Sequence, residues 1–163
     1  MNLASPDEPG IVVLDISDQV FTFVDAQGAE WHWNASAGVR LVEASGRQPS
    51  AFHPSDHGLT ISKLQGQYAD LDLDYARTTN PTRPILFVPF WDGTSILIDG
   101  WHRTAGAILR GIPFLLCHEL TKEEAEQVLV MKIPPPEAKS PKLAPMAPTR
   151  SREAPHPKGE HRQ

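Results

Sequence analysis

The chain has 163 residues, of which 40% are hydrophobic and 21% are charged, a balance typical of one globular domain with a flexible segment. Its net charge of −5 is unevenly distributed, because residues 1–132 hold 9 Lys and Arg against 17 Asp and Glu, whereas residues 133–163 hold 6 against 3. An acidic globular part repels polyanions, so nucleic-acid binding would have to rely on a local patch or on the basic tail, and DNA binding would be weak.

The amino-terminal residues and the cysteine content bear on location. Residues 1–10 are polar and acidic, and no apolar run reaches the length of a membrane span. We therefore expect a cytoplasmic protein that does not enter a membrane. The single cysteine, Cys117, excludes an internal disulfide and is most simply a small core residue.

The first fifty residues predict a β-hairpin. Two aromatic-rich strands, 20–24 and 29–33, flank the turn 25–28. Aromatic residues alternate along each strand and share one face, Phe21 and Phe23 in the first strand and Trp31 and Trp33 in the second. Exposed, this patch could stack bases or receive a protein partner. Buried, it is core, which is the commoner fate of large aromatic residues.

Two clusters of chemically active side chains follow the hairpin. His53 and His57 are four residues apart with Asp56 between them, a spacing that could hold a metal on a helix, although Pro54 and Gly58 argue against a long helix there.

Asp70, Asp72 and Asp74 alternate with apolar residues, which predicts a strand with three carboxylates on one face. Such a face could bind Mg²⁺ or hold a general base, or it could be a solvated edge that blocks strand pairing.

The segment 84–111 predicts a strand, a tight turn at 91–94, a second strand at 95–98 and then a helix that begins near Trp101. Between strand and helix, Asp99 is expected to cap the first helical turn, and Gly100 lets the backbone approach a ligand closely. The free N–H groups of Trp101, His102 and Arg103 would then point outward at the positive end of the helix dipole. An anion is the natural ligand there, unless these are only a cap and a solvated surface.

Beyond this motif, Gly111 and Pro113 end the helix and residues 112–117 predict another strand. Cys117 and His118 should face opposite sides of that strand and cannot chelate together. Thr121 and Glu124 have the spacing of a capping box, which predicts a second helix with an apolar stripe at Ala125, Val128 and Leu129.

The run from Pro84 to Leu129, with "PILFV" and then "ILIDGWHRTAGAILRGIPFLL", resembles the ParB-like/sulfiredoxin superfamily, whose signature is a "DG-x-HR-x-x-A" turn followed by a glycine and another strand. The resemblance implies an α+β fold with a small mixed sheet and helices. It also implies that Gly100, His102 and Arg103 contact nucleotide phosphates and that Asp99 orders the loop. Upstream, residues 80–83 resemble the Asn-Pro and Arg elements of that superfamily, at looser spacing.

The chain also departs from that superfamily. Sulfiredoxins have a catalytic cysteine where this chain has Trp101, which argues against sulfiredoxin chemistry. ParB-type partition proteins continue into a helix-turn-helix region, whereas the folded pattern here ends near Met131. A complete centromere-binding protein is therefore not expected.

The carboxyl-terminal part, 133–163, has eight prolines and no aromatic residue, so it cannot bury enough apolar surface to offset its ordering entropy and is predicted to be disordered. We accordingly divide the chain into an N-terminal hairpin region (1–50), a ParB/sulfiredoxin-like domain (51–132) and a Pro-rich tail (133–163).

These expectations lead to a functional hypothesis, which derives mainly from the resemblance. The domain would bind a nucleoside di- or triphosphate (ATP, ADP or CTP) with Mg²⁺, with slow hydrolysis or phosphoryl transfer. Gly100, Trp101, His102 and Arg103 would bind the phosphates, and Asp99 and Asp72 are the catalytic candidates. The alternatives are a non-enzymatic switch that engages a protein or DNA partner through its hairpin or tail, and a ParB-like nuclease.

Overall fold

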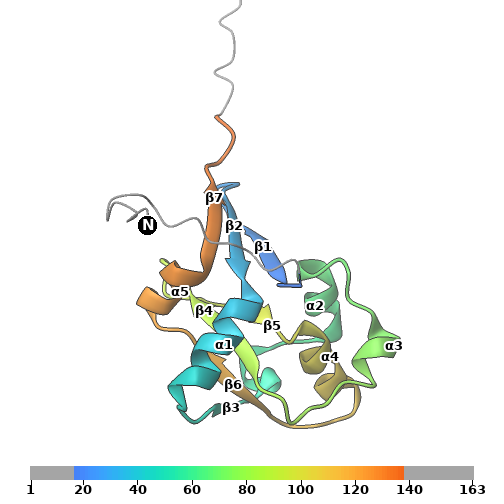
Figure 1. Ribbon diagram of the computed structural model, residues 1–163. Coiled ribbons are helices and arrows are strands. Elements are labelled where there is room, and N and C mark those ends of the chain that lie inside the picture. Colours follow the sequence, from blue (N-terminus) through green and yellow to red (C-terminus); the bar gives the residue numbers. More distant parts are fainter. Residues whose placement is uncertain (1–16, 138–163) are drawn as a thin grey trace, which may run out of the picture.

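The computed structural model describes residues 17–137 as a mixed α/β fold with two sheets (Figure 1). Nearly all of the predicted disordered tail, 138–163, lies outside the described residues. In chain order the elements are β1 (Val20–Val24), β2 (Glu30–Asn34), α1 (Ala35–Ser45), β3 (Ser50–Phe52), the 3₁₀ helix η1 (Pro54–His57), α2 (Ile61–Gln67), α3 (Leu73–Ala76), β4 (Ile85–Pro89), β5 (Ser95–Asp99), α4 (Trp101–Leu109), β6 (Leu115–Glu119), α5 (Lys122–Val128) and β7 (Leu129–Ile133).

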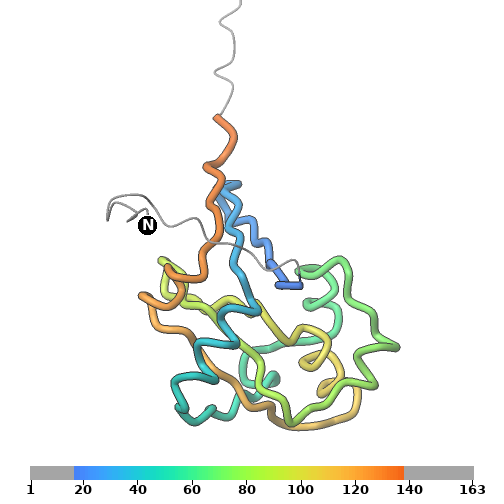
Figure 2. The backbone as a smooth tube through the Cα atoms, viewed as in Figure 1, coloured from blue at the N-terminus to red at the C-terminus, as the bar shows by residue number. Residues whose placement is uncertain are grey.

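The first sheet contains the predicted hairpin and one strand that the sequence pattern did not indicate. Its order is β1-β2-β7, with antiparallel pairing throughout. The chain trace shows it rising from the rest of the molecule (Figure 2). Helix α5 ends at Val128, and Leu129 begins β7 opposite Trp33, so Leu129 belongs to a strand and not to the predicted helical stripe. Pairing with β2, a contact nearly a hundred residues away in sequence, outweighs the local helical pattern there.

The second sheet is mixed and has the order β3-β6-β4-β5. β4 and β5 form the predicted antiparallel hairpin, whereas β4 and β6 run parallel, with Ile85 opposite Cys117. Parallel neighbours need a crossover connection, which β5 and α4 supply. The amino end of α4 therefore leaves the carboxyl end of the edge strand β5.

The aromatic residues of the hairpin are part of the core. Phe23 and Trp31 pack edge-on against Phe90, with ring centroids 5.5 and 5.0 Å apart, and Trp31 stacks on Trp33 at 5.8 Å. The indole Nε1 of Trp31 donates to Asp25 Oδ2 at 3.1 Å. The hairpin thus packs against the β4–β5 hairpin, and these rings fill a core instead of forming a stacking platform.

Helix α5 begins as the sequence predicts. Thr121 accepts a hydrogen bond from the backbone of Glu124, whose side chain reaches back to the backbone of Thr121. The Glu124 carboxylate also accepts from both terminal nitrogens of Arg47, at 2.7 and 3.0 Å. These contacts, led by the Arg47 hydrogen bond, hold the pKa of Glu124 below its usual range.

The second core lies between α2, α3, α4 and the sheet. In α4, Gly106 faces the carbonyl oxygen of Ala76 so closely that an added Cβ would overlap it, which lets α3 lie directly against α4. This close approach brings the start of α3 beside the start of α4.

The Asp70–Asp74 segment does not form the predicted strand. Asp72 is instead the N-cap of α3, and its side chain accepts hydrogen bonds from the backbone of Asp74 and Tyr75 at 3.0 and 3.1 Å. An aspartate that can cap a helix competes with the extended conformation. The three carboxylates consequently do not line one face of a sheet.

No helix between residues 17 and 137 is both long and apolar enough to cross a lipid bilayer.

Candidate functional site

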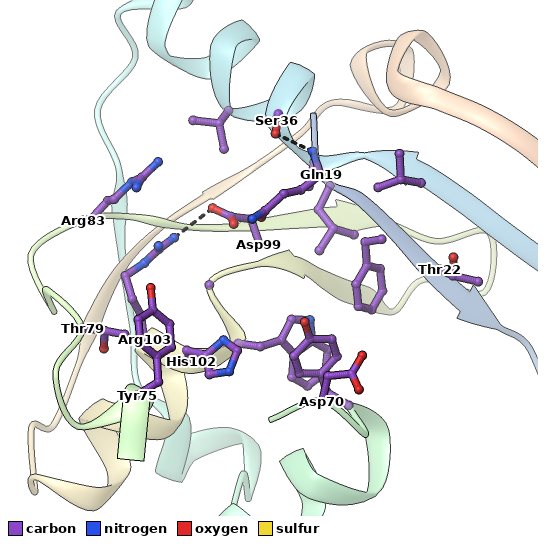
Figure 3. Close-up of a pocket in the computed structure, with 18 of the residues that line it drawn as sticks. Gln19, Thr22, Ser36, Asp70, Tyr75, Thr79, Arg83, Asp99, His102 and Arg103 are labelled. Carbon is purple, nitrogen blue, oxygen red and sulfur yellow. Dashed lines mark hydrogen bonds and ion pairs between the residues drawn. The ribbon is translucent and has the colours of Figure 1, made fainter. Parts of the chain in front are cut away.

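A cavity of about 1040 Å³ lies beside the amino end of α4. Its walls come from β1, one face of α1, the segment from the end of α2 into α3, the approach to β4, and the β5–α4 junction (Figure 3). The four residues of the predicted phosphate motif, Gly100 to Arg103, all line this cavity. The structure therefore places the motif in a concave site.

The backbone at the β5–α4 junction requires glycine. Gly100 is the N-cap of α4, with a φ of +97°, and a Cβ at this position would overlap the side chain of Ile85. The expectation that Asp99 caps the helix is wrong, because α4 has no side-chain cap. The first helical hydrogen bond runs from Thr104 N–H to Gly100 C=O. The preceding N–H groups of α4 are thus left for a ligand or solvent.

Asp99 is engaged by Arg103 instead. The Arg103 guanidinium donates to Asp99 Oδ2 and to the carbonyl oxygen of Pro84, both at 2.9 Å. Only 12% of the Arg103 side chain is exposed, which rules out the alternative that Arg103 is only part of a solvated surface. Its Nε is buried and has no hydrogen-bond partner among the described residues. Arg103 therefore links α4 to β5 and to the approach to β4.

His102 is held by the start of α3. Its Nε2 accepts the backbone N–H of Asp72 at 3.1 Å, and the ring of Tyr75 meets it edge-on at 4.9 Å. Because Nε2 accepts, the neutral ring carries its proton on Nδ1, which remains able to donate to a ligand. Asp72 thus meets His102 through its backbone, while its carboxylate caps α3.

The side chain of Trp101 is buried. It is 8% exposed and packs with Phe21 and Tyr68, at centroid distances of 5.8 and 5.5 Å. Its indole Nε1 is a buried donor without a partner within residues 17–137. We refer to Phe21, Tyr68 and Trp101 as the aromatic trio, and all three line the cavity.

Arg83 is a site residue that the sequence analysis did not select. It lies just before β4, its side chain is exposed, and in Figure 3 it extends into the same side of the cavity as Arg103. The signal that could have found it is the Asn-Pro-Thr-Arg run at 80–83, which resembles an upstream element of the superfamily. That run was too short and too loosely spaced to select a residue.

Negative charge also reaches the cavity. Asp70 and Glu43 line it together with Asp99, so the wall is not uniformly cationic. No group of three or more His, Cys, Asp or Glu side chains within the described residues is arranged to hold a metal ion. Asp99 and Asp70 are the only aspartates among the cavity residues.

The other sequence candidates lie away from this cavity. His53 is the N-cap of the short helix η1 and His57 is its last residue. His57 stacks on Phe52 at 4.7 Å, and His53 Nδ1 lies 4.0 Å from Asp56 Oδ2.

Cys117 and His118 are partly buried on β6, and burial is the main reason that the pKa of Cys117 is raised and that of His118 is lowered. A raised thiol pKa is typical of an unreactive cysteine.

Comparisons of this chain with protein-family models, with curated proteins and with solved structures give no significant match.

Proposed function

We propose that this domain binds a nucleoside di- or triphosphate in the cavity, with the phosphates at the amino end of α4. One observation carries the proposal: the free backbone N–H groups at the start of α4 and the exposed Arg83 border the same cavity, and Trp101 in its wall has a buried Nε1 without a partner among the described residues. Buried donors without partners are rare in folded proteins, and a ligand is one of the explanations they call for. Donors at a helix amino terminus favour an anion.

The charges around the α4 end favour an anion with more than one negative group. Arg83 and Arg103 lie on one side of the cavity, and His102 can donate through Nδ1. Arg103 already neutralises Asp99, so Arg83 would supply the free guanidinium, which can grip two phosphate oxygens at once. Phe21 and Tyr68, the partly exposed members of the aromatic trio, lie in the same cavity wall and would offer apolar surface to a nucleoside.

The cavity, at about 1040 Å³, is at the upper limit of the range of about 300–1,000 Å³ that is usual for small-molecule sites, so it has room for a nucleotide. The resemblance of the 84–129 segment to the ParB-like superfamily implies Mg²⁺ as well. A nucleotide-bound Mg²⁺ needs only one or two protein carboxylates, and Asp99, at the α4 end, would offer it Oδ1, since Oδ2 accepts from Arg103. Bound there, the metal would neutralise phosphate charge.

A binding module is favoured over a hydrolase or nuclease. The Asp72 carboxylate is used to cap α3, and the His102 Nε2 is occupied by a backbone N–H. Neither group is free to take a proton from an attacking water in this arrangement. We therefore propose a nucleotide-dependent switch or sensor, with slow hydrolysis as a secondary possibility that the resemblance implies.

A thermal-shift screen of ATP, ADP, CTP and GTP, with and without Mg²⁺, tests this proposal. A ligand that binds only the folded form raises the melting temperature. In Arg83→Ala the affinity should fall by about tenfold or more, because a charge-assisted contact to phosphate contributes about 1.5–3 kcal/mol.

The matched control is Arg77→Ala, which removes an exposed arginine that does not line the cavity. The control should bind like the wild type. Equal loss in both variants would mean that general charge attraction, and not this cavity, binds the nucleotide.

A further inference from the structure

Strand β1 has one open side. In the sheet of the described residues it lies at the edge, in the order β1-β2-β7. The Ala35 N–H donates to Gln19 C=O and the Asp25 N–H donates to Ala29 C=O, so the backbone groups of Gln19 and Asp25 point toward β2. Along an antiparallel strand every second residue points this way, and the residues between them point to the other side. The backbone groups of Val20, Thr22 and Val24 consequently point away from β2. No hydrogen bond within residues 17–137 engages them.

This edge lacks the features that usually protect an open strand. β1 contains no charged residue and no proline, and the side chains of Val20 and Val24 are 41% and 56% exposed. The bulge in this sheet lies in β2 where it pairs with β7, so it does not bend the β1 edge away. An exposed, uncharged edge of this kind is a template for another strand.

The sequence of β1 identifies a strand that fits. Val20–Val24 reads Val-Phe-Thr-Phe-Val, which is the same in both directions. When two copies pair antiparallel about a two-fold axis at Thr22, each Val20 lies opposite the Val24 of the other copy and each Phe21 lies opposite a Phe23. In that register the outward groups of Val20, Thr22 and Val24 face one another as hydrogen-bonded pairs.

We propose that a second copy of this chain pairs with β1, so that the two three-stranded sheets join into one antiparallel sheet of six strands. This is an isologous interface, in which the same segment meets itself. No charged side chains meet across it, although the chain as a whole carries a net charge of −5. The paired segment is only five residues long, so the dimer is weak and concentration-dependent.

The proposed interface adjoins the cavity. Val20, Phe21 and Thr22 line the cavity from the β1 side, so the strand of the second copy would run along that rim. The proposal does not depend on nucleotide binding, and it is tested on the ligand-free full-length chain.

Sedimentation equilibrium over a range of concentrations tests the pairing. The wild type should show a reversible equilibrium between one and two chains. Thr22→Lys and Thr22→Glu should each weaken it severalfold, because each places like charges opposite one another at the two-fold axis. An equal mixture of the two variants should restore the dimer as a heterodimer. A monomeric wild type, or a mixture that stays monomeric, overturns the proposal.

A second pair of variants tests the backbone hydrogen bonds. Thr22→Pro removes an N–H that faces outward, and proline is tolerated at such an edge position. Thr22→Val keeps this N–H, and both variants lose the contact of the Thr22 hydroxyl with His32 Nδ1. The proline variant should be monomeric and the valine variant should dimerise. If circular dichroism shows that both variants are folded and both dimerise equally, strand pairing is contradicted. If the proline variant does not fold, the mixture of Thr22→Lys and Thr22→Glu decides the question.

Discussion

Two tryptophans of this protein are packed among aromatic rings but differ in how their polar atoms are satisfied. Trp31 lies in the cluster around Phe90, and its Nε1 donates to Asp25. Trp101 lies in the aromatic trio, and its Nε1 is buried without a partner among the described residues. The indole N–H of Trp31 has a partner and that of Trp101 has none among the described residues. This difference, and not the burial of the rings, distinguishes the core around Phe90 from the candidate site.

This difference has a thermodynamic meaning. A buried donor without a partner costs about 1–3 kcal/mol, so a protein keeps one when something else compensates for it. In the Trp31 cluster the polar groups are satisfied, because Asp25 accepts the indole N–H of Trp31 and the backbone N–H groups of Gln27 and Ala29. At the α4 end two buried donors, Trp101 Nε1 and Arg103 Nε, have no hydrogen-bond partner within residues 17–137. We infer that the first region stabilises the fold and the second is built around a ligand.

The largest effect is expected for Gly100→Ala. A positive φ costs a non-glycine residue about 1–2 kcal/mol, and overlap with Ile85 adds about 1–3 kcal/mol, so unfolding should require about 3 kcal/mol less.

Gly93→Ala is the control, because Gly93 also has a positive φ but its Cβ would meet no atom. Urea denaturation should give a clearly smaller loss for this control. Equal losses of unfolding free energy in the two variants would show that the β5–α4 junction has room for a Cβ at Gly100. Only the positive φ would then require glycine there.

Arg103→Ala should destabilise the protein by about 2–3 kcal/mol, because it leaves the mostly buried Asp99 without its partner. In the double variant with Asp99→Asn, the combined loss should be smaller than the sum of the two single losses.

Arg83→Ala is the matched control, because it removes an exposed arginine from the same cavity. It should change the free energy of unfolding by no more than about 0.5 kcal/mol. Chemical denaturation of the wild type, of the two single variants at Arg103 and Asp99, of their double variant and of Arg83→Ala provides the measurement. Additive losses at Arg103 and Asp99 would contradict the bridging role.

Short-range signals predicted much of this fold. The hairpin of β1 and β2, the β4–β5 hairpin and the capping box at Thr121 depend on neighbours in sequence, and the structure confirms them. The cavity itself could not be predicted, because it depends on tertiary packing: Gly106 lets α3 approach α4, and this brings Tyr75 beside His102.

The sequence predictions for two candidate catalytic residues were wrong for the same reason. Asp72 and Asp99 were both interpreted from local patterns, one as part of a carboxylate-bearing strand and the other as a helix cap. In the structure each aspartate has a different partner, the α3 backbone for Asp72 and Arg103 for Asp99. Short acidic side chains accept hydrogen bonds in several local geometries, so spacing alone does not fix their role.

A small effect is expected for the pH response of the Trp31 cluster. The hydrogen bond from Trp31 is the main reason that the pKa of Asp25 is lowered. A carboxylate whose pKa is lower in the folded state adds stability above its unfolded pKa, and this is lost as the pH falls through the folded value.

In Trp31→Phe the pKa of Asp25 should rise toward the usual value for aspartate, as followed by NMR titration of its carboxyl carbon. Trp101→Phe should leave it unchanged. A shift of Asp25 in both variants would indicate a general change of the fold.

The most direct test of the central claim is an NMR titration of ¹⁵N-labelled protein with ATP and with ADP, each with Mg²⁺. The indole N–H of Trp101 and the backbone N–H groups of Trp101, His102 and Arg103 should shift together and saturate, while the indole N–H of Trp31 stays in place. Saturable shifts confined to other parts of the chain, or an equal response of the two indoles, would contradict a phosphate site at the amino end of α4.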